Sequence, residues 1–142
     1  MKTTYTIAVS GTSIAIVPDL TKNDAPDFAA GAVAQGDYVK NPSAGRIYWA
    51  IGSGTGATTP SHKGGVVTVD SIEWLCLTPS RELIISADED VNAYLSKSGP
   101  AIVGEGVRLD GSRPSWEIPR YHGPLFAISD GTATLSISHT LG

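Results

Sequence analysis

Residues 36–77 read GDYVKNPSAGRIYWAIGSGTGATTPSHKGGVVTVDSIEWLCL, which is the most informative stretch of this sequence. Two segments that carry one Trp each, Trp49 and Trp74, flank a loop made almost wholly of Gly, Ser, Thr, Ala and Pro. Apolar side chains alternate over 46–51, as they do in a β-strand with one buried face. The segment 72–77 is apolar on both faces, which predicts a central strand covered on both sides. A loop of this composition holds no acid, base or nucleophile in a fixed frame, which favours a structural surface module over an enzyme.

Composition supports a β-rich chain. The 142 residues are enough for one domain, or for two small β modules that share a core. Apolar residues make up 41%, which suffices for a packed interior, and charged residues only 17%. The chain has 16 Gly and 9 Pro, which oppose helix interiors and suit short strands joined by turns. We therefore predict an all-β fold, an antiparallel β-sandwich or jelly roll with an N-terminal extended arm or hairpin.

Charge, cysteine content and hydropathy exclude several classes of function. The net charge is −4 and no basic tract is present, which argues against nucleic-acid binding. Cys76 is the only cysteine, so an internal disulfide and a thiolate zinc site are excluded, and its apolar neighbours predict a buried thiol. The sequence contains no apolar signal core and no apolar run of about 18 residues that would span a membrane. We therefore expect synthesis in a bacterial cytoplasm and no membrane partner.

Turn signals divide the chain into three segments. Residues 1–35 are expected to form a hairpin of strands 4–10 and 14–17, followed by an arm with one helical turn after Asp27. Residues 36–79 form the Trp-containing β module. Residues 80–142 form a β-sandwich module, either separate from 36–79 or continuous with it. Its expected strands are 82–86, 91–96, 106–109, 115–118, 124–129 and 132–138, the first two paired across the acidic turn Asp88-Glu89-Asp90.

Side chains with catalytic or metal-binding chemistry do not form a recognisable motif. The three histidines, His62, His122 and His139, lack a second ligand at metal-site spacing. Residues 88–90 lack the alternating oxygen ligands, central Gly and distal Glu of a calcium loop. No G-x-S-x-G and no Walker Lys-Ser/Thr pair occurs. We therefore expect no catalytic residue, no cofactor and no metal ligand.

A glycan-processing enzyme is a further class, and it would require a cleft with two carboxylates. The candidates outside turns, besides scattered Asp, are Glu73, Glu82, Glu105 and Glu117. Loss of a hydrolytic activity on their replacement by Ala would overturn the expectation of a non-enzyme.

Exposed aromatic residues are the best candidates for a contact surface. An aromatic ring can stack on the C–H face of a sugar while its polar rim bonds hydroxyls. Trp74 lies among apolar residues on both faces and is assigned to the core. We assign Tyr48, Trp116 and Tyr121 to the possible contact surface, with core packing as the alternative for each.

Two segments resemble structural proteins of bacteriophage virions. The first is 36–77, with its order of Trp strand, small-residue loop, Val-rich strand, short turn and IEWL strand. The second combines ELIISADEDVNAYLSKSGPAIVGEGVRL (82–109) with GPLFAISDGTATLSISHTLG (123–142). It is similar to a C-terminal β module of capsid-attached and tail-attached phage proteins.

The resemblance implies a head decoration (cement) protein on the capsid surface of a virion. Such a protein binds the major capsid protein, often as a homotrimer, and stabilises the assembled head by mass action because it binds the shell and not free subunits. An arm such as 12–36 would cross neighbouring subunits and order on binding. The alternative is a head-fibre or tail-attached adhesion module that binds host-surface glycans through exposed aromatics. A host glycan is a partner only under that alternative.

Overall fold

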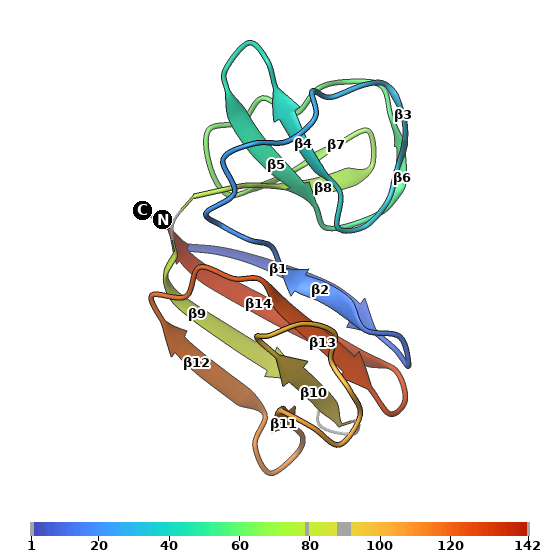
Figure 1. The fold of residues 1–142 in the computed structure, drawn as a ribbon, viewed down its shortest axis with the longest axis vertical. Helices are drawn as coiled ribbons and strands as arrows, with labels where there is room; N and C mark the ends of the chain where they lie inside the picture. The colour runs from blue at the N-terminus through green and yellow to red at the C-terminus, as the bar shows by residue number, and fades with distance from the viewer. Residues whose placement is uncertain (1, 79, 88–91, 142) are drawn as a thin grey trace.

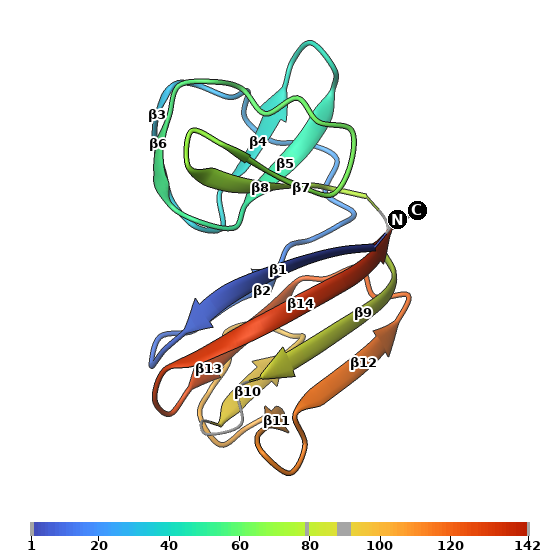
Figure 2. The ribbon, with the colours of Figure 1, turned by 180° about the vertical axis from the view of Figure 1, so that it is seen from behind.

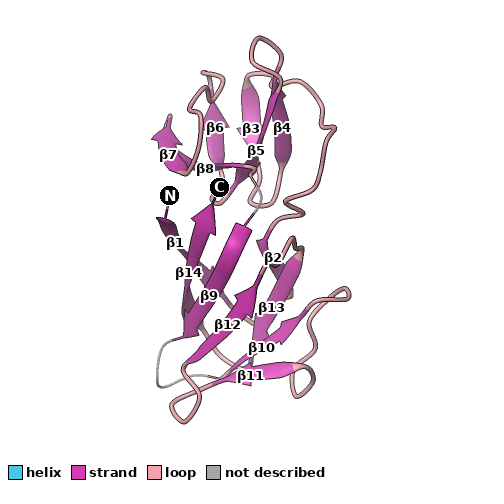
Figure 3. Cartoon of the chain, turned by 90° about the vertical axis from the view of Figure 1, so that its left-hand side faces the viewer, coloured by secondary structure: helices cyan, strands magenta, loops and turns pink. Residues whose placement is uncertain are grey.

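The computed structural model describes residues 2–78, 80–87 and 92–141, and this part of the chain consists of strands and loops without a helix (Figure 3). No helix that could cross a membrane is therefore found in these ranges. The all-β prediction is confirmed. The strands are β1 (Lys2–Val9), β2 (Ile14–Val17), β3 (Gly31–Val33), β4 (Tyr38–Asn41), β5 (Arg46–Ala50), β6 (Gly54–Gly56), β7 (Val66–Val69), β8 (Ile72–Cys76), β9 (Ser80–Ala87), β10 (Ala93–Ser96), β11 (Val107–Leu109), β12 (Ser115–Pro119), β13 (Leu125–Ser129) and β14 (Ala133–Leu141).

Eight of these strands form a sandwich of two antiparallel sheets, ordered β1-β14-β9-β12 and β11-β10-β13-β2. The sheets lie face to face in the lower part of Figures 1 and 2. On β1, Tyr5, Ile7 and Val9 are buried and the residues between them are largely exposed, as the alternation predicts. Leu135 and Ile137 of β14 are buried as well, and all five side chains belong to the core between the sheets.

The two N-terminal strands form where expected, but they do not pair as a hairpin. β1 pairs with β14 in register Lys2↔Thr140, whereas β2 pairs with β13 in the opposite sheet. The chain crosses from one sheet to the other over residues 10–13. Both strands turn their apolar faces into the same interior, one from each of the two sheets. Residues 2–17 thus complete both sheets of the sandwich and form no separate N-terminal module.

The prediction that strands 82–86 and 91–96 pair as a hairpin is also wrong. β9 pairs with β14 and β12 in one sheet, whereas β10 pairs with β13 and β11 in the other. The expected acidic turn, residues 88–90, lies outside the described ranges. As at the N-terminus, consecutive strands contribute to opposite sheets because each sheet must supply half of the core.

The remaining strands form a second module, seen in the upper part of Figure 1. Its sheet has the order β4-β5-β8-β7, so that β8 is central as predicted, and the short strands β3 and β6 pair beside it. A two-residue turn with φ of 52° at Asp70 and 65° at Ser71 joins β7 to β8, and such positive angles are those of a type I′ turn. β6 lies within the loop of small residues, where no strand was expected.

The segment expected to form an arm packs on its own chain. Instead of a helical turn, Asp27 makes a parallel bridge to Lys40, and the Phe28 N–H donates to the Lys40 carbonyl at 2.9 Å. The Phe28 ring meets Trp74 edge-on with centroids 6.3 Å apart. β3 then pairs with β6. Burial of Phe28 against an indole gives this segment a partner that the polar sequence around it did not suggest.

The sheet of the second module has a core on each face. Tyr48, Trp74 and Cys76 belong to the core on the outer side, which confirms the buried thiol. Trp49 and Leu75 belong to the core on the other side, which is continuous with the interior of the sandwich. The rings of Tyr5 and Trp49 are 6.3 Å apart across this junction. The two modules therefore share one apolar interior.

Candidate functional site

Tyr48 is fully buried, so it cannot be an exposed contact residue, contrary to the expectation. It lies in the central strand β5, and the small-residue loop covers it. Its hydroxyl donates to the His62 carbonyl at 2.7 Å. Alternation predicted that Tyr48 and Trp49 point to opposite faces of their strand, but only the tertiary structure shows that both faces are covered.

The other two expected contact residues, Trp116 and Tyr121, lie close together. Both rings are half-buried, and both pack against the edge of the sandwich core. The Lys97 Nζ lies over both rings, 5.2 Å from the centroid of Trp116 and 5.5 Å from that of Tyr121. The Tyr121 hydroxyl donates to the Pro124 carbonyl, and burial raises the pKa of this phenol. We call these three residues the Lys97 cluster.

The Lys97 cluster bridges the two sheets of the sandwich. Trp116 belongs to β12, whereas Lys97 directly follows β10 in the opposite sheet. A cation over an aromatic face is attracted by the ring quadrupole, which holds the ammonium group close to both rings. The cluster thus combines apolar ring surface with a positive charge, which suits a ligand that carries both hydroxyls and a carboxylate. Sequence reasoning missed Lys97, because nothing local links it to aromatic residues in another sheet.

Lys97 also begins a loop, residues 97–106, that exposes apolar side chains. Ile102 and Val103 are 58% and 46% exposed, the two largest values for bulky apolar residues in the described ranges. Val67 follows at 40%. We call residues 97–106 the apolar loop. A hollow of about 380 Å³ beside it is lined by Ser96, Ser98, Pro100, Ile102, Glu105 and Gly106.

The apolar loop is anchored on both sides of its exposed tip. Ala101 is buried, and its N–H donates to the Ser13 hydroxyl at 2.8 Å. The Glu105 N–H donates to the Ile102 carbonyl at 3.0 Å and closes a turn. Gly106, at φ of 79°, lies so close to β10 that a Cβ there would be 2.2 Å from the Leu95 carbonyl oxygen. The tip is therefore presented in a preformed shape.

Two of the three histidine side chains, those of His139 and His62, make contacts inside the fold, whereas the side chain of His122 is exposed. His139 is fully buried, and burial lowers its pKa to about 4. One ring nitrogen of His62 lies 3.1 Å from the Gly65 carbonyl oxygen, and burial lowers the pKa of His62 as well. The His122 carbonyl accepts from the Leu20 N–H. In the described ranges, no three His, Cys, Asp or Glu side chains gather in the manner of a metal site.

The four candidate carboxylates are spread over different elements. Glu73 belongs to β8 in the second module, and Glu105 belongs to the apolar loop. Glu82 and Glu117 lie on adjacent strands, where the register Ile84↔Glu117 places them on the same outer face of the sheet. Both side chains are exposed. The structure therefore brings two of the four onto one open sheet surface and places the other two elsewhere.

Comparisons of the chain with protein-family models, with curated proteins and with solved structures find no match.

Proposed function

We propose that this protein is a non-enzymatic decoration protein of a bacteriophage head, which binds the outer surface of the assembled shell and stabilises it. The observation that carries the proposal is the apolar loop, which exposes Ile102 and Val103 from a backbone anchored by Ser13 and Gly106. A preformed loop loses little conformational entropy on binding. More of the free energy gained by burying apolar surface is therefore retained as binding affinity. The resemblance of 36–77 and 82–142 to virion proteins supplies the partner, the major capsid protein.

Decoration requires adhesion to an array and no chemistry. The apolar loop would bury its tip against the shell, with about 25 cal/mol gained for each Å² of apolar surface removed from water. A protein that binds the assembled shell and not free subunits stabilises the particle by mass action. A trimer at a local threefold position would present three such loops at once, and the linked contacts would bind far more tightly than one.

The test uses heads that lack this protein, to which the purified chain is added. We expect saturable binding in hundreds of copies per head, counted against the major capsid protein, and a rise in the temperature at which heads release DNA. Ile102→Asp places a charge in the contact and should weaken binding by roughly tenfold or more. Val67→Asp is the control, because Val67 is an exposed apolar residue in the other module.

Three results would contradict the proposal. They are binding of free capsid subunits as tight as binding of heads, a stoichiometry of a dozen copies or fewer, and full binding by Ile102→Asp. Circular dichroism of each variant shows whether the fold is intact.

The second candidate is an adhesion module that binds host-surface glycans, and the Lys97 cluster favours it. Trp116 of β12 and Tyr121 of the loop that follows it lie under one ammonium group. Under this function, Trp116→Ala should abolish binding of labelled protein to host cells while leaving attachment to heads unchanged. Labelled antibody on intact particles separates the candidates further, since it would mark the whole shell for a decoration protein and only the tail for a tail-attached adhesin.

A further inference from the structure

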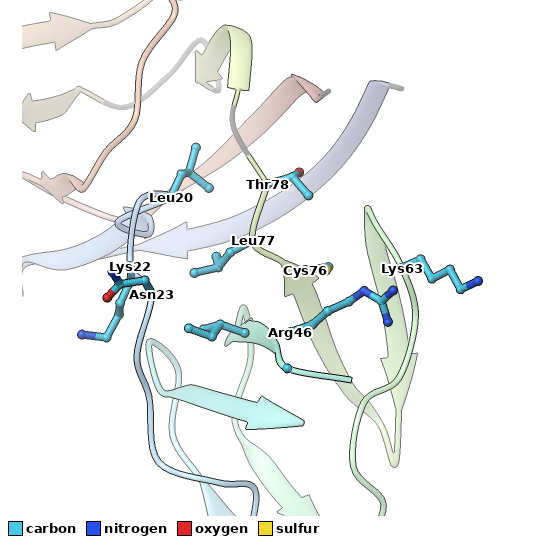
Figure 4. A pocket seen from close by; sticks show the side chains of 10 residues that line it. Leu20, Lys22, Asn23, Arg46, Lys63, Cys76, Leu77 and Thr78 are labelled. Atoms are coloured by element: carbon cyan, nitrogen blue, oxygen red, sulfur yellow. The ribbon is translucent and has the colours of Figure 1, made fainter. Parts of the chain in front are cut away.

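A groove of about 350 Å³ lies where the two modules meet (Figure 4). Its apolar side chains come from three parts of the chain: Leu20 from the segment after β2, Ile47 from β5, and Leu77 from the position directly after β8. Lys22 and Arg46 extend on opposite sides of Leu77 in Figure 4, and Lys63 lies beyond Arg46 with its amine directed away from Leu77. The other lining residues are Asn23, Gly45, Cys76 and Thr78.

The two cations on either side of Leu77, Lys22 and Arg46, have different neighbours. The Lys22 Nζ lies 4.9 Å from the centroid of the Tyr38 ring, a cation–π contact. Arg46 is half-buried at the start of β5. Burial raises the pKa of Cys76 and of Tyr48, and the charge of Arg46 opposes this rise. The field of Arg46 therefore reaches into the base of the groove.

The charge of the groove is uncompensated, although the chain as a whole carries −4. None of Lys22, Arg46 and Lys63 makes an ion pair within the described residues. Among the residues that the structure describes, no Asp or Glu lines the groove. Asp19, in the same segment as Lys22, accepts from the Thr21 N–H and hydroxyl at 3.0 and 2.6 Å and is engaged in its own turn. Charge complementarity therefore selects an anion.

We propose that this groove binds an acidic peptide segment, with one carboxylate at Lys22, another at Arg46, and an aliphatic side chain between them on Leu20, Ile47 and Leu77. The fork of Arg46 suits a carboxylate because it can donate two parallel hydrogen bonds. Nucleic acid fits less well, since single strands are held by aromatic stacking and no aromatic residue lines the groove. The inference does not depend on the decoration function, because a shell protein and a tail protein could each present such a segment.

The test uses a fluorescent synthetic hexapeptide of alternating Asp and Leu, with a matched peptide of Asn and Leu. Anisotropy titrations at low ionic strength should show binding of the acidic peptide and much weaker binding of the neutral one. Binding should decline as salt is added, because the cations are at the surface. Arg46→Gln should weaken binding of the acidic peptide by about tenfold.

Matched variants locate the site. Arg113→Gln removes a basic side chain from the turn after β11 in the sandwich and should leave binding unchanged. Lys22→Gln, in a loop segment, is a second groove variant that puts no core packing at risk, and it too should weaken binding. Near-ultraviolet circular dichroism reports whether each variant is folded.

Several outcomes would overturn the proposal. One is equal affinity for the acidic and neutral peptides, and another is wild-type affinity in folded Arg46→Gln and Lys22→Gln. Displacement of the peptide by millimolar inorganic phosphate would show an unselective anion site. Tighter binding of a single-stranded oligonucleotide, lost in Arg46→Gln, would assign the groove to nucleic acid instead.

Discussion

His139 is the buried polar residue with the clearest consequence for stability. It continues the inward face of β14 after Leu135 and Ile137, a position where alternation places an apolar side chain. Its Nε2 lies 3.4 Å from the Tyr5 hydroxyl, which itself donates to the Ile16 carbonyl at 2.6 Å. The two rings stack with centroids 5.8 Å apart. Because burial disfavours the imidazolium, the pKa of His139 falls from 6.5 to about 4.

Stability should therefore fall as the solution is acidified from about pH 6.5 towards pH 4. In that interval the unfolded chain takes up a proton at His139 that the folded chain does not, so protonation favours unfolding. A shift from 6.5 to about 4 corresponds to roughly 3 kcal/mol across the interval. His62, whose pKa is also lowered, acts in the same direction.

Urea unfolding of the wild type and of His139→Gln at pH 7 and pH 4.5 measures this dependence. The variant should be less stable at pH 7, because Gln does not fill the same space, but it should lose less stability on acidification. An equal loss in both proteins would assign the pH dependence to other groups.

Ser71 offers a test of backbone strain at a single residue. Its φ of 65° places it in the left-handed region, which costs a residue with a Cβ roughly 1 kcal/mol and glycine little. Ser71→Gly should raise the free energy of unfolding by roughly 0.5 kcal/mol after allowance for the greater flexibility of glycine in the unfolded chain. Asp70 is left in place because its carboxylate accepts from the Ala57 and Thr58 N–H groups. A lower midpoint of thermal unfolding would contradict this account of the turn.

At the scale of elements, the apolar loop shows how a surface feature depends on the strand behind it. The loop leaves β10 at Ser96 and enters β11 at Val107, and the two strands pair in register Leu95↔Val107. Gly106, at φ of 79°, lies against the carbonyl of Leu95, with no room for a Cβ. Gly104 has a similar φ of 88°, but nothing lies within 4 Å of where its Cβ would be.

The two glycines form a matched pair for mutation. Gly104→Ala should cost about 1 kcal/mol, the usual price of a positive φ at a residue with a Cβ. Gly106→Ala adds a collision with backbone and should cost on the order of 3 kcal/mol, by displacement of the loop from β10. Chemical denaturation measures both changes. If head binding depends on the preformed loop, Gly106→Ala should weaken it more than Gly104→Ala does, and equal costs would contradict the close contact with Leu95.

At the scale of the whole molecule, the two modules are joined by packing as well as by the chain. Trp49 and Leu75 face the sandwich from the second module, and Tyr5 faces them from β1. Main-chain and side-chain hydrogen bonds reinforce the junction: the Gln35 amide donates to the Ala15 carbonyl at 2.9 Å, and the Tyr38 hydroxyl accepts from the Asp19 N–H at 2.8 Å. A shared interior makes the stability of each module depend on the other.

We therefore expect a single cooperative unfolding transition. Trp49→Ala removes a fully buried indole and should lower the free energy of unfolding by about 3–5 kcal/mol. Fluorescence of Trp116 in the sandwich, isolated by replacing the other indoles with Phe, should report the same midpoint as far-ultraviolet circular dichroism of the whole chain. Val67→Ala, at an exposed site of the second module, is the control and should change stability little. Two separate transitions would show that the modules fold independently.

The alternation of apolar residues and the composition of the chain predicted much of the fold. Alternation over residues 4–9 identified the buried face of β1, and the doubly apolar run 72–76 identified a central strand with Cys76 in the core. Low charge and abundant Gly and Pro predicted an all-β chain. These features are properties of neighbouring residues, because the period of a strand and the conformations open to a turn are set within a few positions of the chain.

Strand pairing and the surface sites were decided by contacts between distant residues. Alternation shows that β1 and β2 each bury a face, but it does not show which strand lies beside each, so the expected hairpin gave way to opposite sheets. Because alternation gives no information on contacts between distant residues, it also failed to predict the burial of Tyr48 and the position of Lys97 over two rings. The groove that Lys22 and Arg46 line is formed by segments that lie far apart in the sequence. The sequence by itself therefore determined the type of each strand, and the tertiary structure determined its partners, since burial of one shared core depends on every strand at once.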